Sequence, residues 1–278
     1  MSSEPSGRPD GGVAGRRLIV TGGGSGIGRA VAIGAARRGA RVVVAGRRAA
    51  ELDATARDGG GRITAVPADV ADDAQVDALV ATAAERLGGL DGVVNAAGVH
   101  GAAASMDLST GDFARILDVN LTGAFRVSRA AGRVLAASGG GAITHVASLA
   151  SFGGFPGRLA YGVAKAGLVQ LVRTLAAEWG SLGVRVNAVA PGFVRTPIAD
   201  ELQRRGILDT AQIERRTPLR RRADPEDMVG PTLFLHSADA GFVTGECLVA
   251  DGGWLAHTGF VDHYSDPERP GPAGASPG

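Results

Sequence analysis

Tyr161 and Lys165 are the residues of this sequence whose types and spacing most directly suggest chemistry. They lie four positions apart in the segment YGVAKAG, so in a helix both side chains share one face and can enter the same cleft. A free phenol has a pKa of about 10, and a nearby ammonium group lowers that pKa by stabilising the phenolate. We therefore predict Tyr161 as a general acid/base tuned by Lys165. The alternative is a tyrosine packed in the core beside a solvated lysine.

The composition makes these residues stand out. Lys165 is the single lysine among 29 basic residues, and the chain has only two tyrosines and three asparagines, Asn95, Asn120 and Asn187. Because arginine supplies every other basic side chain, the retained lysine suggests a task that a bulky planar guanidinium cannot perform. Compositional chance is the competing explanation.

A glycine-rich loop provides a second chemical feature. The apolar run RLIV at 17–20 leads into TGGGSGIG at 21–28, and an Ala-rich amphipathic segment follows. Glycines between a strand and a helix let the backbone approach a pyrophosphate, which the free N–H groups and positive end of the helix attract. A purely structural tight turn is the alternative. The glycine spacing differs from the common G-x-G-x-x-G pattern.

The elements that must position these residues form an alternating pattern. Short β-branched runs are separated by Ala-rich segments long enough for crossover helices, and the runs lie at 17–20, 41–45, 63–66, 92–95, 142–147, 184–190 and 247–250. Continuous apolar strands of this kind are typical of a parallel sheet covered on both faces. We predict a single-domain α/β fold, a Rossmann-type doubly wound parallel sheet of about seven strands with helices on both faces.

Composition and length limit the other possibilities. The chain has 278 residues, 45% of them hydrophobic, and a net charge of +1, which argues against a disordered polymer and a nucleic-acid-coating protein. We predict one domain over 14–264 between Pro/Gly/Ser-rich disordered tails at 1–13 and 265–278. No apolar run is long enough for a membrane span, and the first residues lack a secretory signal. We therefore expect a cytoplasmic protein without membrane or nucleic-acid partners.

Cysteine and histidine usage indicates that a metal centre is absent. Cys247 is the only cysteine and the five histidines do not cluster, so neither a multi-thiolate site nor a disulfide is expected. Redox chemistry would then depend on a bound organic cofactor.

The loop TGGGSGIG resembles the cofactor loop of the short-chain dehydrogenase/reductase family, and the resemblance extends over about residues 14–254. Further family motifs follow in family order, namely Asn95-Ala96-Ala97-Gly98, Asn120, Ser148, Tyr161 with Lys165, Pro191-Gly192, Thr196 and Asp251-Gly252-Gly253. Two of the three asparagines, Asn95 and Asn120, fall on motif positions, together with the only lysine and one of the two tyrosines, although the composition disfavours these residue types. The sequence is therefore similar to that family over most of its length.

The resemblance implies a catalytic set of Asn120, Ser148, Tyr161 and Lys165. Ser148 would hydrogen-bond the substrate oxygen, Lys165 would also bond the nicotinamide ribose, and Asn120 would hold a helix bend and anchor a water relay to the lysine. Asn120 could equally bond its own backbone. Ser151 is the nearest competitor of Ser148, but it is expected to line the substrate region or be solvated.

The resemblance also implies a nicotinamide cofactor. The second strand ends in Ala45-Gly46-Arg47-Arg48 without the acidic residue that would bond the ribose hydroxyls, so NADP is favoured and NAD remains the alternative. Ser25 stands where many NADP-preferring relatives have a basic residue. Asp69-Val70 resembles the family's adenine contact, although Asp69 is also a plausible helix N-cap. We predict as cofactor-binding residues Gly22, Ser25, Gly26, Ile27, Gly28, Arg47, Arg48, Asp69, Val70, Asn95, Ala96, Gly98, Tyr161, Lys165, Pro191, Gly192 and Thr196.

The substrate side is less specific. We expect a lid at about 196–224, with the Arg220–Arg222 run either attracting an anionic substrate or lying on a solvated face. His100, residues 152–156 and Trp254 should border the pocket, or Trp254 should cover a neighbouring subunit. Family members usually form tetramers through the helices predicted at 112–136 and 160–180, which implies a homotetramer here.

We thus predict an NAD(P)-dependent oxidoreductase that transfers a hydride between nicotinamide and a ketone or secondary alcohol, with Tyr161 as the general acid/base. One alternative is a dinucleotide-binding regulator without turnover. The other is an epimerase or dehydratase with a retained cofactor, although such enzymes need a larger C-terminal substrate region.

Overall fold

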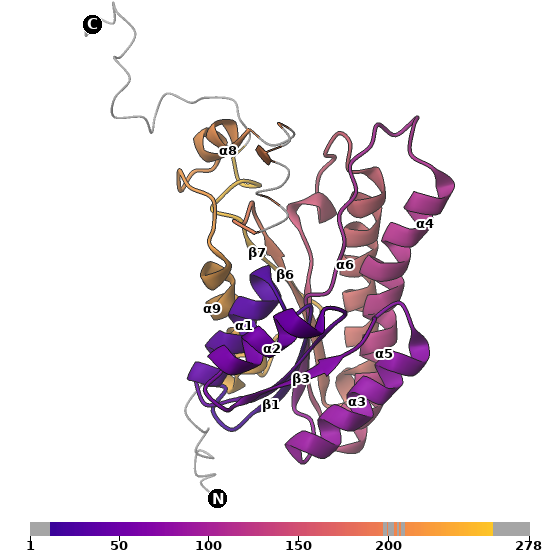
Figure 1. Ribbon diagram of the computed structural model, residues 1–278, viewed down its shortest axis with the longest axis vertical. Coiled ribbons are helices and arrows are strands. Elements are labelled where there is room, and N and C mark those ends of the chain that lie inside the picture. Colours follow the sequence, from indigo (N-terminus) through magenta and orange to yellow (C-terminus); the bar gives the residue numbers. More distant parts are fainter. Residues whose placement is uncertain (1–11, 197–198, 200–202, 205, 207–208, 258–278) are drawn as a thin grey trace, which may run out of the picture.

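A computed structural model describes residues 12–196, 199, 203, 204, 206 and 209–257 of the chain. The predicted tails lie almost wholly outside the described residues, as does part of the predicted lid. Seven parallel strands form one sheet in the order β3-β2-β1-β4-β5-β6-β7 (Figure 1). The strands are β1 Arg17–Thr21, β2 Arg41–Gly46, β3 Ile63–Pro67, β4 Gly92–Asn95, β5 Gly141–Val146, β6 Val184–Pro191 and β7 Cys247–Ala250. The predicted fold class and all seven strands are confirmed.

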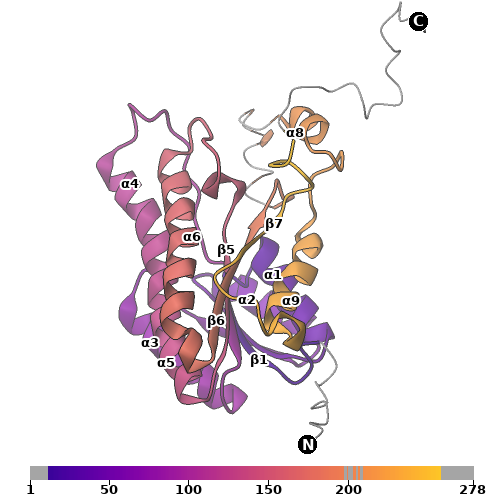
Figure 2. The ribbon, with the colours of Figure 1, turned by 180° about the vertical axis from the view of Figure 1, so that it is seen from behind.

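Helices cover both faces of the sheet (Figures 1 and 2). One layer contains α1, α2 and α9, and the other contains α3, α5 and α6, with α4 packed beside α6. Their bounds are α1 Gly26–Arg37, α2 Ala49–Asp58, α3 Asp73–Leu87, α4 Thr110–Leu117, α5 Gly123–Ala137, α6 Leu159–Trp179, α8 Thr210–Arg216 and α9 Val229–His236. The helices predicted at 112–136 and 160–180 are therefore α4 with α5, and α6.

The continuous apolar strands have a physical cause in this layering. Successive side chains of a strand point to opposite faces, so Ile19 packs toward α3 and α5 whereas Leu18 and Val20 pack toward α1. All three side chains are fully buried. Because both faces are covered, every position of β1 needs an apolar residue, and the alternation of apolar and polar residues disappears.

The strand order creates the site. The chain runs outward from β1 to β3, then returns to β4 on the other side of β1. Thr21 at the end of β1 stands opposite Asn95 at the end of β4, and the loops that follow these two strands diverge to opposite faces. Open α/β sheets bind ligands in the crevice at this reversal point, beside the carboxyl ends of the strands.

Two further properties concern the described residues alone. None of the helices in these ranges is both long and apolar enough to cross a membrane. Within the same ranges, no group of three or more His, Cys, Asp or Glu side chains is arranged to hold a metal ion.

Candidate active site

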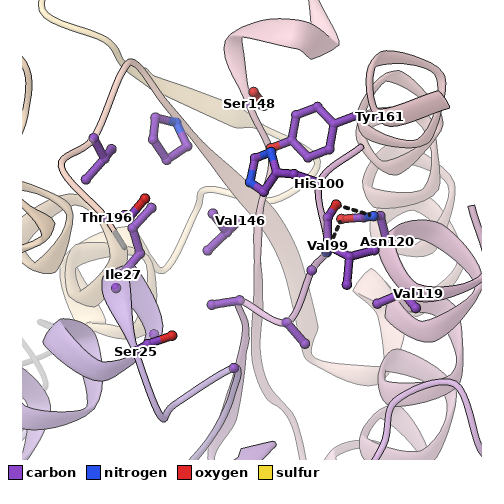
Figure 3. A pocket seen from close by; sticks show the side chains of 18 of the residues that line it. Ser25, Ile27, Val99, His100, Val119, Asn120, Val146, Ser148, Tyr161 and Thr196 are labelled. Atoms are coloured by element: carbon purple, nitrogen blue, oxygen red, sulfur yellow. Dashed lines mark hydrogen bonds between the residues drawn. The ribbon is translucent and has the colours of Figure 1, made fainter. Parts of the chain in front are cut away.

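A cleft of about 1140 Å³ runs along the carboxyl edge of the sheet. Drug-sized ligands occupy pockets of roughly 300–1,000 Å³, so this cleft has room for a dinucleotide together with a small substrate. We call the part lined by the loop after β1, Arg47, Arg48 and Asp69 the glycine-loop end. We call the part lined by Ser148, Tyr161, Lys165, Asn120 and His100 the tyrosine end (Figure 3).

Backbone shape defines the glycine-loop end. Gly22 has φ +66°, and a Cβ atom there would lie 2.7 Å from the carbonyl oxygen of Ala96. A Cβ at Gly28 would lie 2.3 Å from the carbonyl oxygen of Gly22, which is closer than any real contact. Only glycine allows these segments to approach so closely. The loop therefore leaves an open concave backbone surface toward the cleft.

The N-terminus of α1 faces this surface without a cap. Ser25 is the N-cap residue, but its side chain accepts no hydrogen bond from the first turn. Within the described residues, no backbone carbonyl accepts from the amides of Gly26, Ile27 and Gly28, whereas the amide of Arg29 donates to Ser25. Free amides at a helix N-terminus attract an anion. The cradle formed by this loop thus fits the pyrophosphate of a dinucleotide.

The side chains around the glycine-loop end are mostly charged. Arg47 is exposed, while the Arg48 guanidinium pairs with Glu51 at 2.7 Å and lies 3.5 Å from the hydroxyl of Ser25. Glu51 was not predicted from the sequence because it lies in α2, beyond the end of the second strand. An acidic group is therefore present at this end of the cleft, but it is engaged by Arg48.

Asp69 and Val70 also line the glycine-loop end. The alternative interpretation of Asp69 as a helix N-cap is wrong, because α3 is capped by Asp72, whose side chain accepts from the amide of Gln75. Asp69 instead accepts from the amide of Ala71 at 3.0 Å and shapes the turn before the helix.

Asn95 is the one predicted cofactor-binding residue that does not line the cleft. Its side chain is buried behind the loop after β4, where it accepts a hydrogen bond from the hydroxyl of Thr21 and lies 3.3 Å from Nδ1 of His145. The other ring nitrogen of His145 lies 3.0 Å from the hydroxyl of Ser128. Asn95 thus joins β1, β4 and β5 and supports the Ala96–Gly98 turn, which does line the cleft.

Tyr161 and Lys165 both reach the tyrosine end from the first turns of α6. Lys165 is 5% exposed, its ammonium donates to the carbonyl of Val146 at 2.6 Å, and it lies 5.7 Å from the centre of the Tyr161 ring. The alternative of a solvated lysine beside a core tyrosine is therefore wrong, since both side chains reach the cleft. Burial lowers the pKa of Lys165 to about 8.

The predicted tuning of Tyr161 by Lys165 needs correction. The pKa of Tyr161 is raised, because burial opposes the charged phenolate more than hydrogen bonding to Ser148 and the charge of Arg158 favour it. The ammonium of Lys165 donates to the carbonyl of Val146 and lies over the Tyr161 ring, 5.7 Å from its centre, without a hydrogen bond to the phenol oxygen within the described residues. Arg158 is thus the cation that acts on Tyr161 in this structure, and the phenol stays protonated at neutral pH.

Ser148 lies directly after β5, and its hydroxyl faces Tyr161 (Figure 3). It also accepts from the amide of Ala150 and so starts a short 3-10 helix, Leu149–Ser151. Its competitor Ser151 does not line the cleft, and its hydroxyl donates to the backbone carbonyl of Lys165 at 2.9 Å. Ser151 is therefore neither solvated nor substrate-lining, but ties the turn after β5 to α6.

Asn120 holds a bend between α4 and α5. Residues Asp118–Thr122 form a π-helical turn, and the Asn120 amide donates to the carbonyls of Ile116 and Val99, both at 2.9 Å. Its side-chain oxygen accepts from the amide of Val99 at 3.3 Å (Figure 3). The expected role in holding the bend is present, and the alternative of bonding its own helix coexists with it. No hydrogen bond within the described residues joins Asn120 to Lys165 directly.

His100 forms a wall of the tyrosine end. Its ring stacks on Tyr161 with the ring centres 4.5 Å apart and the planes at 22° (Figure 3). Desolvation of the stacked ring, followed by the charges of Arg158 and Lys165, lowers the pKa of His100, although the residue as a whole is exposed. The position of His100 at the pocket was predicted from the sequence, whereas its stacking on Tyr161 was not.

Residues 152–156 and Trp254 were also expected to border the pocket on its substrate side. Of residues 152–156, Phe155 lines the cleft and Phe152 is exposed. Trp254 is buried against Phe193, a cleft residue, with the Arg216 guanidinium 4.2 Å above its ring. Trp254 therefore closes the pocket edge. The expected lid contains α8 among its described residues.

The arginine run of the predicted lid does not line the cleft. Arg221 pairs with Asp227 at 2.5 Å, Arg222 lies 3.8 Å from Glu214, and Arg220 donates to the carbonyl of Arg215. These side chains stabilise their own segment. The run was predicted either to attract an anionic substrate or to lie on a solvated face. Its position outside the cleft favours the solvated face.

Arg158 also lines the cleft, and it was not among the residues predicted from the sequence. It lies three positions before Tyr161, as the residue that precedes α6. Residues three apart at a helix start are neighbours on its surface, and this spacing was the available signal. Thr196 lies beside the glycine loop, since a Cβ at Gly26 would lie 3.3 Å from its methyl group.

Comparisons with known proteins agree with this geometry. A family model described as enoyl-(acyl carrier protein) reductase matches residues 22–255. The uncharacterised short-chain type dehydrogenase/reductase y4vI of Sinorhizobium fredii is 40% identical over 87% of this chain, which spans 44% of that protein. The short-chain reductase NovJ of Streptomyces niveus is 39% identical, with 84% of this chain and 92% of NovJ covered.

A solved structure supports the same conclusion. A Beutenbergia cavernae protein with NADP bound at low occupancy has a TM-score of 0.81 and 43% identity, covering 88% of this chain and 98% of that chain. Together with the family model, these relatives confirm the resemblance stated from the motifs. The chain belongs to the short-chain dehydrogenase/reductase family and is an NAD(P)-dependent oxidoreductase that acts on alcohol or carbonyl groups.

Proposed function

We propose that this enzyme interconverts a ketone and a secondary alcohol, with Tyr161 transferring the proton. The observation that carries the proposal is the position of the phenol, which lines the tyrosine end beside the hydroxyl of Ser148 and lies about one helical turn from Lys165. The bound nicotinamide supplies or accepts the hydride. The acid, the hydrogen-bond donor and the cation that this chemistry requires are thus all side chains of this chain.

Each residue has a distinct task in the reductive direction. Ser148 donates a hydrogen bond to the carbonyl oxygen and orients it toward Tyr161, which gives its proton to that oxygen as negative charge develops. The raised pKa of Tyr161 keeps the donor protonated at neutral pH. Lys165 supplies a positive charge and a titratable group behind the phenol, and Asn120 fixes the bend that shapes this wall.

Oxidation of an alcohol reverses these steps and requires the phenolate. Because a raised pKa disfavours the phenolate, oxidation should accelerate as the pH rises and reduction should slow.

Replacing Tyr161 tests the proposal directly. Tyr161→Phe keeps the ring and its stacking on His100 but removes the proton, so we expect turnover to fall by about 10²–10⁴-fold, the usual contribution of a general acid. Absorbance of the reduced nicotinamide measures the rate, and calorimetry checks that cofactor binding is retained. Tyr264→Phe removes the other tyrosine of the chain and serves as the control. Full activity in Tyr161→Phe would exclude this residue from the mechanism.

We further propose that the glycine-loop end binds NADP in preference to NAD. Arg47 lies at the end of β2, is exposed and lines the cleft, and no ion pair engages it within the described residues. Arg48 is partly neutralised by Glu51. The Arg47 guanidinium is therefore the cation available for a 2′-phosphate. The other predicted cofactor contacts that line the cleft would hold the pyrophosphate, the adenine and the nicotinamide ribose.

A single substitution tests this preference. Arg47→Ala should weaken NADP binding by about 10–100-fold, because a charge-assisted hydrogen bond contributes about 1.5–3 kcal/mol, while NAD binding should hardly change. Titration calorimetry with both cofactors gives the two dissociation constants. Arg57→Ala, on an exposed arginine at the other end of α2, is the matched control. An equal loss for both cofactors would reject the 2′-phosphate role.

Larger-scale features of the protein belong to the same proposal. We propose one catalytic domain over 14–264 with a substrate lid at about 196–224, located in the cytoplasm. Exposed Phe125 on α5 with Leu159 and Val163 on α6 support assembly of a homotetramer through these helices, because apolar patches of this kind mark protein interfaces.

A further inference from the structure

Arg158 occupies an unusual position at the tyrosine end of the cleft. It precedes α6, three residues before Tyr161, and its side chain is half-buried. It lines the cleft together with His100, Gly101 and Phe155. The proposed reaction does not use it. A positive charge is therefore placed beside the reacting groups, where it acts on Tyr161 only through its field and neither gives nor accepts the proton.

No carboxylate neutralises this charge. Within the described residues Arg158 forms no ion pair, and its one protein hydrogen bond is a long contact of 3.4 Å from Nη1 to the carbonyl of Gly101. Two other partly buried arginines have acidic partners, Arg17 with Asp91 and Arg126 with Asp118, and Arg185 donates to the backbone carbonyls of Val243 and Leu235 at 3.2 and 2.8 Å. A guanidinium has five N–H donors, so most of those of Arg158 remain available.

The acidic residues that line the cleft lie far from Arg158. They are Glu51 and Asp69, which follow β2 and β3 on one side of the sheet, whereas Ser148 and the tyrosine end lie beside β5. Four strand spacings separate β3 from β5 in the sheet order, which is about 19 Å. Glu51 is in addition already paired with Arg48. Neither carboxylate compensates the charge at the tyrosine end.

An unpaired, half-buried cation is costly to maintain. Burial lowers the pKa of Arg158. The charge of Arg158 partly offsets the rise in the pKa of Tyr161 that burial causes, and it adds to the fall in the pKa of His100. The guanidinium lies beside Gly101, the residue after His100, whose ring stacks on Tyr161. A bound anion would supply the pairing that Arg17 and Arg126 obtain from the protein.

We infer that Arg158 binds the carboxylate of an oxo-acid or hydroxy-acid substrate whose reacting carbon faces Tyr161. The inference rests on the proposed function. A planar guanidinium matches a carboxylate with two parallel hydrogen bonds. Arg158 donates to the carbonyl of Gly101, the residue after His100, whose ring stacks on Tyr161, so we expect the carboxylate to lie only a few bonds from the carbonyl. Phe155 and Phe193 line the same part of the cleft and provide an apolar wall for the rest of the substrate.

A matched substrate series tests the inference. The probes are 2-oxobutanoate, 3-oxobutanoate and 4-oxopentanoate, each paired with its neutral methyl ester and assayed with both nicotinamides. We expect the wild type to prefer at least one acid over its ester by tenfold or more in kcat/KM. Arg158→Gln should reduce that acid-to-ester ratio by at least tenfold, mainly through the KM of the acid, and Arg158→Lys should restore part of it.

The control distinguishes this site from the arginine run of the lid. Arg220→Gln removes an exposed guanidinium that does not line the cleft, and it should leave the acid-to-ester ratio unchanged. If Arg158→Gln slowed acids and esters equally, Arg158 would only position the Gly101 segment, and the inference would be wrong. An ester turned over as well as its acid throughout the series would also overturn it, while leaving the proposed function intact.

A binding measurement separates the two proposals further. Calorimetry of butanoate and butanamide with NADP-loaded enzyme reports anion binding without turnover. Butanoate should bind at least tenfold more tightly than butanamide, and Arg158→Gln should abolish the difference. If no substrate in the panel were reduced yet this difference persisted, the proposed reaction would be wrong and the anion site would stand. If butanoate and butanamide bound equally, the anion site would be rejected whatever the turnover.

Discussion

The two ends of the cleft present different kinds of surface to a ligand. At the glycine-loop end the ligand surface is backbone, with amides of Gly26, Ile27 and Gly28 free at the start of α1 and charged side chains around the rim. At the tyrosine end the ligand surface consists of side chains, and two of these, Lys165 and Asn120, are almost completely buried. The first end therefore depends on the absence of side-chain atoms, and the second depends on charged or polar groups held away from water.

This difference predicts how each end of the cleft responds to substitution. A backbone surface tolerates changes of charge nearby but not an added carbon atom, because the approaching segments cannot separate without moving whole elements. A buried polar cluster tolerates little change of chemistry, and it is maintained at a cost in stability. Substitutions at the two ends should thus differ in whether binding, turnover or stability changes.

The largest effect is expected from one added methyl group in the glycine loop. A Cβ at Gly28 would lie 2.3 Å from the carbonyl oxygen of Gly22 and 2.7 Å from its carbon. Since both are backbone atoms, the loop must be displaced. Gly28→Ala should weaken cofactor binding at least 100-fold and lower the free energy of unfolding by about 1–3 kcal/mol. Calorimetry and chemical denaturation measure the two changes.

Gly180→Ala is the control for this substitution. Gly180 has φ −56°, and no heavy atom lies within 4 Å of a Cβ built there, so cofactor binding and stability should remain close to those of the wild type. Wild-type cofactor affinity in Gly28→Ala would show that the loop adapts and that its backbone shape does not define the site.

The same contrast determines what the sequence could predict. The strands and the glycine loop follow from local patterns, because buried parallel strands such as β1 are continuously apolar and a strand–glycine–helix order fixes the loop. Ser148, Tyr161 and Lys165 reach one cleft because their elements end at the same edge of the sheet. These features need only the order of the elements.

The electrostatics of the tyrosine end could not be predicted from the order of the elements. The pKa of Tyr161 depends on its burial and on Arg158 rather than on the i+4 lysine, and burial is a tertiary property. The engagement of Asn95 by Thr21 and His145 joins residues 50 to 74 positions apart. The choice of Asp72 over Asp69 as a cap depends on where the turn after β3 ends.

An intermediate effect is expected at Lys165, where function and stability should change in opposite directions. Burial lowers the pKa of Lys165 from 10.5 to about 8, which corresponds to a penalty of about 3 kcal/mol for the charged form in the folded state. Lys165→Met removes this penalty and loses one hydrogen bond to Val146, worth about 1–2 kcal/mol. We expect turnover to be lost while the free energy of unfolding at pH 7 rises by about 1–2 kcal/mol.

The lowered pKa of Lys165 also predicts how the stability difference between Lys165→Met and the wild type changes with pH. The folded pKa lies below the unfolded one, so the penalty is fully present below pH 8 and disappears as the pH rises to about 10.5. The stability advantage of Lys165→Met over the wild type should therefore shrink across this range in denaturation experiments. An advantage that stayed constant with pH would mean that the lysine is not buried in its charged form.

The smallest effect is expected from a matched pair of serine substitutions at two helix starts. Ser109 caps α4, where its hydroxyl accepts from the amide of Asp112 at 3.0 Å. Ser25 holds the equivalent position at α1 but caps no amide. Ser109→Ala should therefore lower the free energy of unfolding by about 1 kcal/mol, whereas Ser25→Ala should change it by less than about 0.5 kcal/mol.

Cofactor binding should show the reverse order for the same pair. Ser25 lines the cleft and Ser109 does not, so Ser25→Ala should weaken cofactor affinity about fivefold, as the loss of one neutral hydrogen bond would. Ser109→Ala should leave it unchanged. If Ser25→Ala instead destabilised the apo fold as much as Ser109→Ala, the start of α1 would be an ordinary capped helix. Its free amides would then not be reserved for a ligand, and the distinction between the two ends of the cleft would weaken.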